Sequence, residues 1–151
     1  MIKSETPEEI KARIKRESAQ VRKVIESHNA KLERWYAAGE IDSVVTVFAE
    51  DARQMPPNGV TQVGREAIRE FWKQAVTWGK WNFSLNTVSV EANGPLAMEL
   101  GRYTLNFTPG LAAPLGVTAI ADTGNYVCQW RLENGKWLIV LDIVNRDQPL
   151  E

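Results

Sequence analysis

The spacing of the apolar residues changes near residue 80, and this change restricts the chain to few folds. Before it, apolar side chains recur mostly at intervals of three and four, which is one face of an α-helix. After it, Trp81–Val88 alternates apolar with small polar residues, as a half-buried strand does. Helices followed by antiparallel strands predict an α+β fold with the helices on one face of a sheet. The helical positions are Ile10, Ile14, Val21, Val24, Ile25, His28, Leu32, Trp35 and Tyr36.

The first helix has clear start and stop signals. Thr6 can cap it, Pro7 suits its first turn, and Glu9 completes a capping box. Gly39 is typical of a helix end. About 30 residues in one helix would extend roughly 45 Å, which is more than a domain of this size needs. We therefore expect residues 1–20 to overhang the domain or to pack against a second subunit.

The remaining elements follow from short local patterns. A second helix is predicted from Ile41 to Phe48, and a brief extended piece at 52–54 precedes a turn at 55–59. Further elements are a helix at 65–76, strands at 81–88 and 96–108, and a hairpin of 124–133 and 136–146 closed by Asn134-Gly135. No repeat or linker divides residues 1–151, which predicts a single domain.

Composition excludes several classes of function. The 18 Lys and Arg residues balance 19 Asp and Glu residues, so no basic excess favours nucleic acid or an anionic membrane surface. One cysteine and one histidine rule out an intrachain disulfide and a multi-histidine or Cys-rich metal site. Met1–Glu5 runs into charged sequence without a secretory apolar segment, and prolines and glycines interrupt the uncharged stretch 103–121. We expect a cytoplasmic protein with no metal or cofactor.

Several segments resemble the nuclear transport factor 2-like superfamily, and in particular its SnoaL-like and ketosteroid-isomerase-like members. The similarity covers about residues 20–147. Its motifs identify the fold more than the activity, because members include isomerases, cyclases, epoxide hydrolases and association domains. The segments are Trp35–Glu40, Val47–Ala52, Met55–Pro57, Gly64–Ile68, Val127–Trp137 and Asp142–Asn145.

The resemblance implies a cone in which three helices pack on a strongly curved, mixed or antiparallel sheet around a ligand pocket. It also implies which strand positions face that pocket. On the closing hairpin these are Tyr126, Cys128, Trp130 and Leu132, opposite Val140, Asp142 and Val144. On the preceding strand they are Leu100, Arg102, Thr104 and Asn106.

Departures from the relatives narrow the expected chemistry. The positions of the ketosteroid isomerase base, tyrosine and second aspartate correspond to Pro56, Leu32 and Cys128, so steroid isomerisation is not expected. Of the pocket arginines found in the calmodulin-dependent kinase association domain, only Arg102 is present. The epoxide hydrolase pattern is an arginine between two aspartates. Arg102 and Asp142 meet half of it, but Thr104 stands where the second aspartate is needed.

Asp142 and Arg102 are the main catalytic candidates. Asp142 lies in the apolar run 137–144, where an unpaired charge is costly to bury. Burial would raise its pKa and make it a usable base, whereas a nearby Arg102 would lower the pKa. One reading is a base oriented by Arg102, or an Arg102 that binds a carbonyl or carboxylate. The alternative is a structural ion pair.

Other candidates have weaker support. His28 on the helical stripe could act as an acid or base, or could be a core histidine. Cys128 would need a base beside it to act as a nucleophile. Trp35, Trp72, Tyr126 and Trp130 suit an apolar ligand but also suit core packing. Met55 and the uncharged loop 109–121 are expected beside the pocket mouth, the loop as a lid or as an oligomer contact.

These observations predict binding of a small, mainly hydrophobic molecule carrying a carbonyl or carboxylate. Cofactor-free acid–base catalysis of the isomerase, cyclase or lyase type is one outcome. A non-catalytic binding or association module is the other. The resemblance also implies a homodimer formed through the convex sheet face, where Val127, Gln129 and Arg131 are expected.

Overall fold

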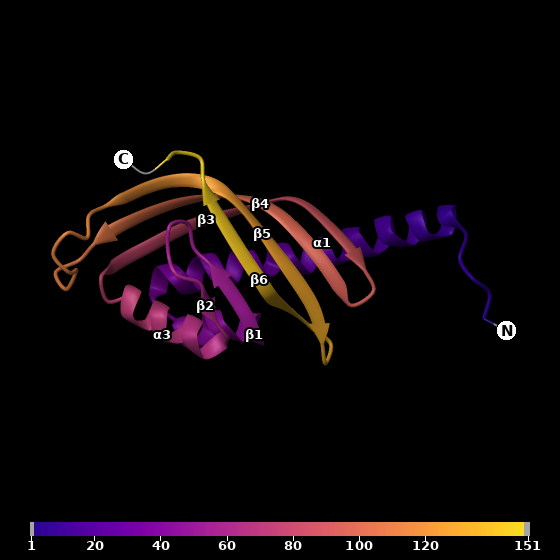
Figure 1. The fold of residues 1–151 in the computed structure, drawn as a ribbon, viewed down its shortest axis with the longest axis horizontal. Coiled ribbons are helices and arrows are strands. Elements are labelled where there is room, and N and C mark those ends of the chain that lie inside the picture. Colours follow the sequence, from indigo (N-terminus) through magenta and orange to yellow (C-terminus); the bar gives the residue numbers. More distant parts are fainter. Residues whose placement is uncertain (1, 150–151) are drawn as a thin grey trace.

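A computed structural model describes residues 2–149. The chain folds into three helices that pack on one face of a curved, open six-stranded sheet (Figure 1), as the α+β cone prediction requires. The sheet order is β2-β1-β6-β5-β4-β3, with β1 and β6 parallel and the other neighbours antiparallel. Within residues 2–149, no helix combines the length and apolar composition that a membrane span needs.

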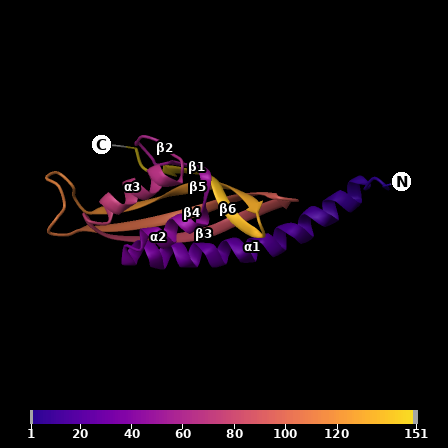
Figure 2. The same cartoon turned by 90° about the horizontal axis from the view of Figure 1, so that it is seen from below.

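Helix α1 (Pro7–Ala38) begins and ends at the predicted signals. Thr6 and Glu9 form the capping box, and Gly39 takes a left-handed conformation (φ 71°) at the C-cap. The helix runs along the sheet below β3 and β4, and its first turns extend beyond the sheet (Figure 2). Arg13 Nη1 donates to Asn93 Oδ1 at 2.8 Å, which ties this part of the helix to the β3–β4 hairpin.

The segment after Gly39 differs from the prediction. Helix α2 (Ile41–Val44) is followed by one 3-10 turn (Val45–Val47), and Phe48 already begins strand β1 (Phe48–Met55). The expected brief extended piece is therefore an eight-residue strand. It is stabilised by parallel pairing with β6, a long-range contact that local spacing does not reveal.

The other elements agree with the predicted order. Strand β2 (Gln62–Val63) and helix α3 (Arg65–Ala75) follow the turn at 56–59. Strands β3 (Gly79–Asn93) and β4 (Leu96–Pro109) form a long hairpin with a bulge between Thr87 and Ser89. Strands β5 (Ile120–Glu133) and β6 (Lys136–Arg146) form the second hairpin, and the first residue of β5 lies four positions before the expected start.

Two tyrosine rings lie over glycines of the neighbouring strand. Gly101 is paired with Tyr126, and Gly124 is paired with Tyr103 across the β4–β5 ladder. A Cβ at Gly101 would overlap the Tyr126 ring, and one at Gly124 would overlap the Asn145 carbonyl and the Tyr103 ring. The glycines therefore let both phenols lie flat on the concave face, where they contribute to the cavity wall.

Candidate functional site

A cavity of about 380 Å³ lies between the concave sheet face and the helices. This volume is in the range of small-molecule sites, and most of its wall is aromatic or aliphatic. Leu32 and Tyr36 of α1, Trp72 of α3 and Phe83 of β3 belong to that wall. Its charged groups lie in two clusters, one around Asp142 and one around Asp122, and Asn29 and Asn58 are further polar lining residues.

The first cluster is built on the parallel β1–β6 pair. Gln54 lies directly opposite Asp142 in the register, and its Nε2 donates to Asp142 Oδ2 at 3.1 Å. Trp72 Nε1 donates to Gln54 Oε1 at 2.7 Å, which fixes the amide so that its NH₂ faces the carboxylate. The Cys128 thiol, 3.6 Å from Asp142 Oδ1, completes the group.

The surroundings of Asp142 shift the pKa of its carboxyl group. Burial raises the pKa of this carboxyl above its ordinary value, and the negative charge of Glu99 raises it further. The hydrogen bonds from Gln54 and Cys128 act in the opposite direction, because they stabilise the carboxylate. Within residues 2–149, Asp142 forms no salt bridge. A carboxyl with a raised pKa is a stronger base than an exposed aspartate, and this one faces an apolar cavity where it can exchange a proton with a ligand.

Two neighbouring groups are uncharged. Burial raises the pKa of the Tyr36 phenol, and the charge of Asp142 adds to the rise. Burial, followed by the charge of Asp142, also raises the pKa of the Cys128 thiol well above its ordinary value. Because the thiolate is the reactive form, this environment does not activate Cys128 as a nucleophile.

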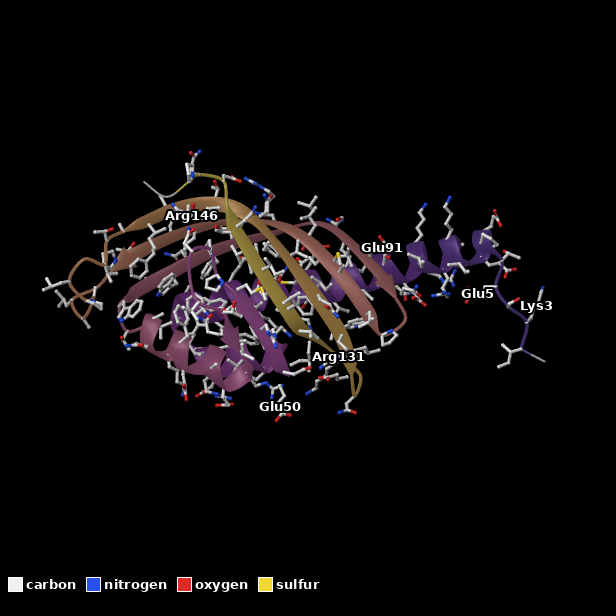
Figure 3. All side chains as sticks on the ribbon, viewed as in Figure 1. Lys3, Glu5, Glu50, Glu91, Arg131 and Arg146 are labelled. Carbon is white, nitrogen blue, oxygen red and sulfur yellow. The ribbon has the colours of Figure 1, made fainter. Side chains whose placement is uncertain are left out.

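The second cluster lies toward the start of β5. Asp122 Oδ2 accepts a hydrogen bond from Tyr103 OH at 3.0 Å and lies 3.0 Å from Arg146 Nε. All three residues line the cavity. Arg146 is at the C-terminal end of β6, at the opposite end of the hairpin from Arg131 (Figure 3).

The predicted pair of Asp142 and Arg102 does not form. Strand β4 alternates without a bulge, and its concave face carries the odd-numbered residues from Ala97 to Phe107. Arg102 and Thr104 therefore lie on the outer face, where Arg102 Nη2 pairs with Asp147 Oδ2 at 2.6 Å. The expected phase of this strand is wrong by one residue, which turns every side chain to the other face.

The remaining predicted residues divide into two groups. Five line the cavity, namely Asp142, Tyr126, Cys128, Val144 and Trp72. Four others do not line the cavity. Trp130 is fully buried and His28 stacks on it. Trp35 is half-buried, and Met55 points away because its neighbour Gln54 points inward.

The environment of His28 does not support a catalytic role. Its ring lies 5.6 Å from the Trp130 ring at 14°, and its Nδ1 has no partner in the described part of the chain. Burial lowers the pKa of His28, and the charge of Lys31 contributes. The residue is therefore a neutral ring packed outside the cavity.

A buried carboxylate behind the cavity was missed from the sequence. Glu99 is fully buried and accepts from Asn29 Nδ2 (2.8 Å), Thr87 Oγ1 (2.9 Å), Tyr126 OH (2.7 Å) and Trp130 Nε1 (3.1 Å). Four donors compensate the desolvation of its charge and hold Tyr126 in place. In residues 2–149, no group of three or more His, Cys, Asp or Glu side chains is placed to hold a metal ion.

Gln54, Asp122 and Arg146 were also missed. Arg146 could have been found by continuing the inward phase of Asp142 and Val144 by two residues. Asp122 continues the inward phase of Tyr126 in the same way, but it lies before the predicted start of its strand. Gln54 carries no local signal of this kind, because β1 was not predicted as a full strand.

Solved structures of other proteins share this fold. A putative calcium/calmodulin-dependent protein kinase II association domain from Xanthomonas campestris has a TM-score of 0.66 and 21% identity, over 99% of this chain and 97% of that chain. An NTF2-like protein with a cystatin-like fold from Novosphingobium aromaticivorans has a TM-score of 0.72 and 15% identity, over 98% and 94%. A ketosteroid isomerase-like protein from Erwinia carotovora atroseptica has a TM-score of 0.69 and 14% identity, over 83% and 95%.

At these identities the likeness is one of fold. A comparison with curated proteins gave no match. A family model described as the SnoaL-like domain matches residues 30–140, which include β1 to β5 and the first five residues of β6. The chain therefore belongs to the SnoaL-like domain family, and its fold is the cone of NTF2-like proteins.

Proposed function

We propose that this chain binds a small, mainly hydrophobic molecule in the cavity and performs cofactor-independent acid–base chemistry on it through Asp142. The observation that carries the proposal is the position of the Asp142 carboxyl. It faces an apolar cavity, is held by Gln54 and Cys128, and has a raised pKa. The reaction class is isomerisation, cyclisation or lyase-type elimination.

The proposed step is a proton transfer at carbon. The Asp142 carboxylate removes a proton from the carbon beside a carbonyl group, and the electron pair of the broken C–H bond moves into the enolate. The protonated carboxyl then returns the proton to the same or another carbon, so that atoms and charge balance. Tyr36, an uncharged phenol on the same wall, is the proposed hydrogen-bond donor to the enolate oxygen.

The proposal is tested with a neutral carbonyl compound in D₂O. We expect the protein to accelerate exchange of the α-protons of 2-tetralone, followed by NMR. Asp142→Asn is expected to retain binding of the ketone while exchange falls by about 10² or more. Equal exchange with wild type and Asp142→Asn would refute the role of Asp142, and Thr104→Ala on the outer face is the matched control.

A second candidate is a non-catalytic, self-associating module. It is favoured by an apolar row on the outer face of the sheet, where Leu100, Val127, Ile143 and Met55 are in register across four strands. Leu100 and Ile143 are each 40% exposed in the monomer. We propose that this row is the contact of a homodimer, and that the protein is cytoplasmic, as its single thiol fits a reducing compartment.

The proposed dimer contact is compatible with either candidate, since the row and the cavity lie on opposite faces of the sheet, and the candidates differ only in whether the cavity is catalytic. They are separated by the exchange experiment. Binding of 2-tetralone without any acceleration of exchange by the wild type would favour the non-catalytic module over the enzyme.

A further inference from the structure

Arg146 is a charged side chain in the cavity wall that makes few contacts of its own. Its side chain is 28% exposed, and Nε lies 3.0 Å from Asp122 Oδ2. The geometry of that contact does not make a hydrogen bond, and Nε is buried. Within residues 2–149, the guanidinium donates no hydrogen bond to a protein acceptor. A guanidinium has five N–H donors, so most of its capacity is open to a ligand.

The charge beside Arg146 restricts what that ligand can be. The Asp122 side chain is only 7% exposed and already compensates the guanidinium. A carboxylate on the ligand would bring a second negative charge next to the nearly buried carboxylate of Asp122. A neutral acceptor, such as a carbonyl oxygen, would use the open donors of Arg146 without this repulsion.

Arg146 and Asp142 lie at different points along the cavity. They are four residues apart on β6, with Val144 between them on the same face, so their Cα atoms are about 13 Å apart. The wall between them is formed by Val144 and by the ring of Tyr126, which is paired with Val144 on the neighbouring strand β5. Leu105 and Phe83 continue the apolar wall level with Asp122. A molecule that meets both polar clusters must be elongated and hydrophobic in its middle.

We propose that Arg146 binds a neutral hydrogen-bond acceptor at one end of an elongated hydrophobic ligand, and that the other end of this ligand lies at Asp142. The inference rests on the proposed use of the cavity as a ligand site, but it does not require Asp142 to be catalytic. Arg146 thus has the ligand-binding role that the sequence analysis expected of Arg102. It selects for a neutral ligand rather than an anion.

The test compares three probes of similar shape: 2-acetylnaphthalene, 2-isopropylnaphthalene and 2-naphthoate. Binding is measured by quenching of tryptophan fluorescence. The hydrocarbon has no hydrogen-bond acceptor, so its affinity reports only the burial of apolar surface. The quantity compared between variants is therefore the ratio of the ketone and hydrocarbon Kd values. We expect Arg146→Met to weaken the ketone relative to the hydrocarbon by on the order of ten-fold. Arg102→Met, on the outer face, is the matched control and is expected to leave the ratio unchanged.

A second variant tests the choice of a neutral ligand. Asp122→Asn removes the charge that compensates Arg146, so 2-naphthoate should gain affinity relative to the ketone by on the order of ten-fold. A purely structural role of Asp122 would not produce this gain. Circular dichroism spectra and melting curves establish that each variant is folded.

The outcomes separate this inference from the proposed function. An unchanged ketone-to-hydrocarbon ratio in Arg146→Met, or tighter binding of 2-naphthoate than of the ketone to wild type, overturns the role of Arg146 and leaves Asp142 untouched. Failure of all three probes to bind the wild type overturns both proposals. A ratio that depends on Arg146, with no exchange of 2-tetralone, supports this inference and contradicts catalysis.

Discussion

Gln54 and Asp142 face each other across the only parallel strand pair within residues 2–149, with 3.1 Å between Gln54 Nε2 and Asp142 Oδ2. The Trp72 indole fixes the other end of the Gln54 amide at 2.7 Å. Gln54 therefore fixes the position of the Asp142 carboxyl, and the hydrogen bond from Trp72 fixes Gln54. This arrangement joins β1, β6 and α3 at the cavity. It therefore links the stability of the fold to the protonation state of Asp142.

Gln54→Leu is expected to raise the pKa of Asp142 further, because it removes a hydrogen bond to the carboxylate. The pH profile of proton exchange should shift to higher pH. Leaving Trp72 Nε1 without an acceptor should cost about 1–3 kcal/mol in the free energy of unfolding. Urea unfolding and the pH–rate profile measure the two effects. Gln74→Leu, at an exposed position of α3, is the control and should change neither.

Asp142→Asn is expected to make stability less dependent on pH. The pKa of Asp142 is raised on folding, so the folded state holds its proton more tightly than the unfolded chain. Its contribution is fully present below the ordinary aspartate pKa of about 4 and is lost as pH rises through the folded pKa. Urea unfolding from pH 4 to 8 should show a smaller decline for the variant. A steeper decline in the variant would contradict the raised pKa.

Glu99→Leu is expected to destabilise the fold by about 3 kcal/mol or more, because four buried donors lose their acceptor. Glu99→Gln should cost less, since its carbonyl oxygen still accepts from some of them. Glu91→Leu on the exposed side of β3 is the control and should stay within about 0.5 kcal/mol. Denaturant unfolding distinguishes these variants, and equal costs at Glu99 and Glu91 would be evidence against the network.

Gly101→Ala is expected to displace the Tyr126 ring, because the new methyl group would occupy its place. Overpacking of this kind costs about 1–3 kcal/mol, and the hydrogen bond from Tyr126 OH to Glu99 should be strained as well. Gly110→Ala is the matched control, since its Cβ would have only ordinary contacts. Thermal unfolding of the two variants measures the difference, and equal melting temperatures would contradict the close approach.

Val127→Glu is expected to convert a dimer into a monomer, because it places a charge in the middle of the apolar row on the outer face. Light scattering coupled to size-exclusion chromatography measures the mass. Thr104→Glu changes the same face outside the row and should leave the dimer intact. A wild-type mass of one chain would refute the proposed dimer.

The sequence predicted the elements whose signals are local. The capping box at Thr6, the stop at Gly39 and the turn at Asn134-Gly135 each depend on neighbouring residues, and the structure has all three. The sequence predicts only a brief extended piece in place of β1, because the pairing partner of this strand, β6, lies almost 90 residues away in the chain. Local spacing carries no information about such a partner.

The phase expected for β4 came from the resemblance, and the two halves of this strand indicate opposite phases. In its first half, the apolar residues Leu96, Met98 and Leu100 lie on the outer face, while Glu99 is buried inside. The usual rule of apolar inside and polar outside is therefore reversed there. From Tyr103 to Phe107 the rule holds, and this half alone would have given the correct phase. An inward carboxylate that four donors satisfy cannot be distinguished from an exposed one by spacing alone.

The most direct test of the account is the titration of the Asp142 carboxyl by ¹³C NMR. Its resonance is assigned by its absence from the spectrum of Asp142→Asn, and Asp147 on the outer face provides an internal comparison. We predict that Asp142 titrates above the ordinary aspartate range, whereas pairing with Arg102 lowers the pKa of Asp147. An Asp142 carboxyl that titrates at or below the ordinary value would contradict its role as a proton-transfer group in the cavity.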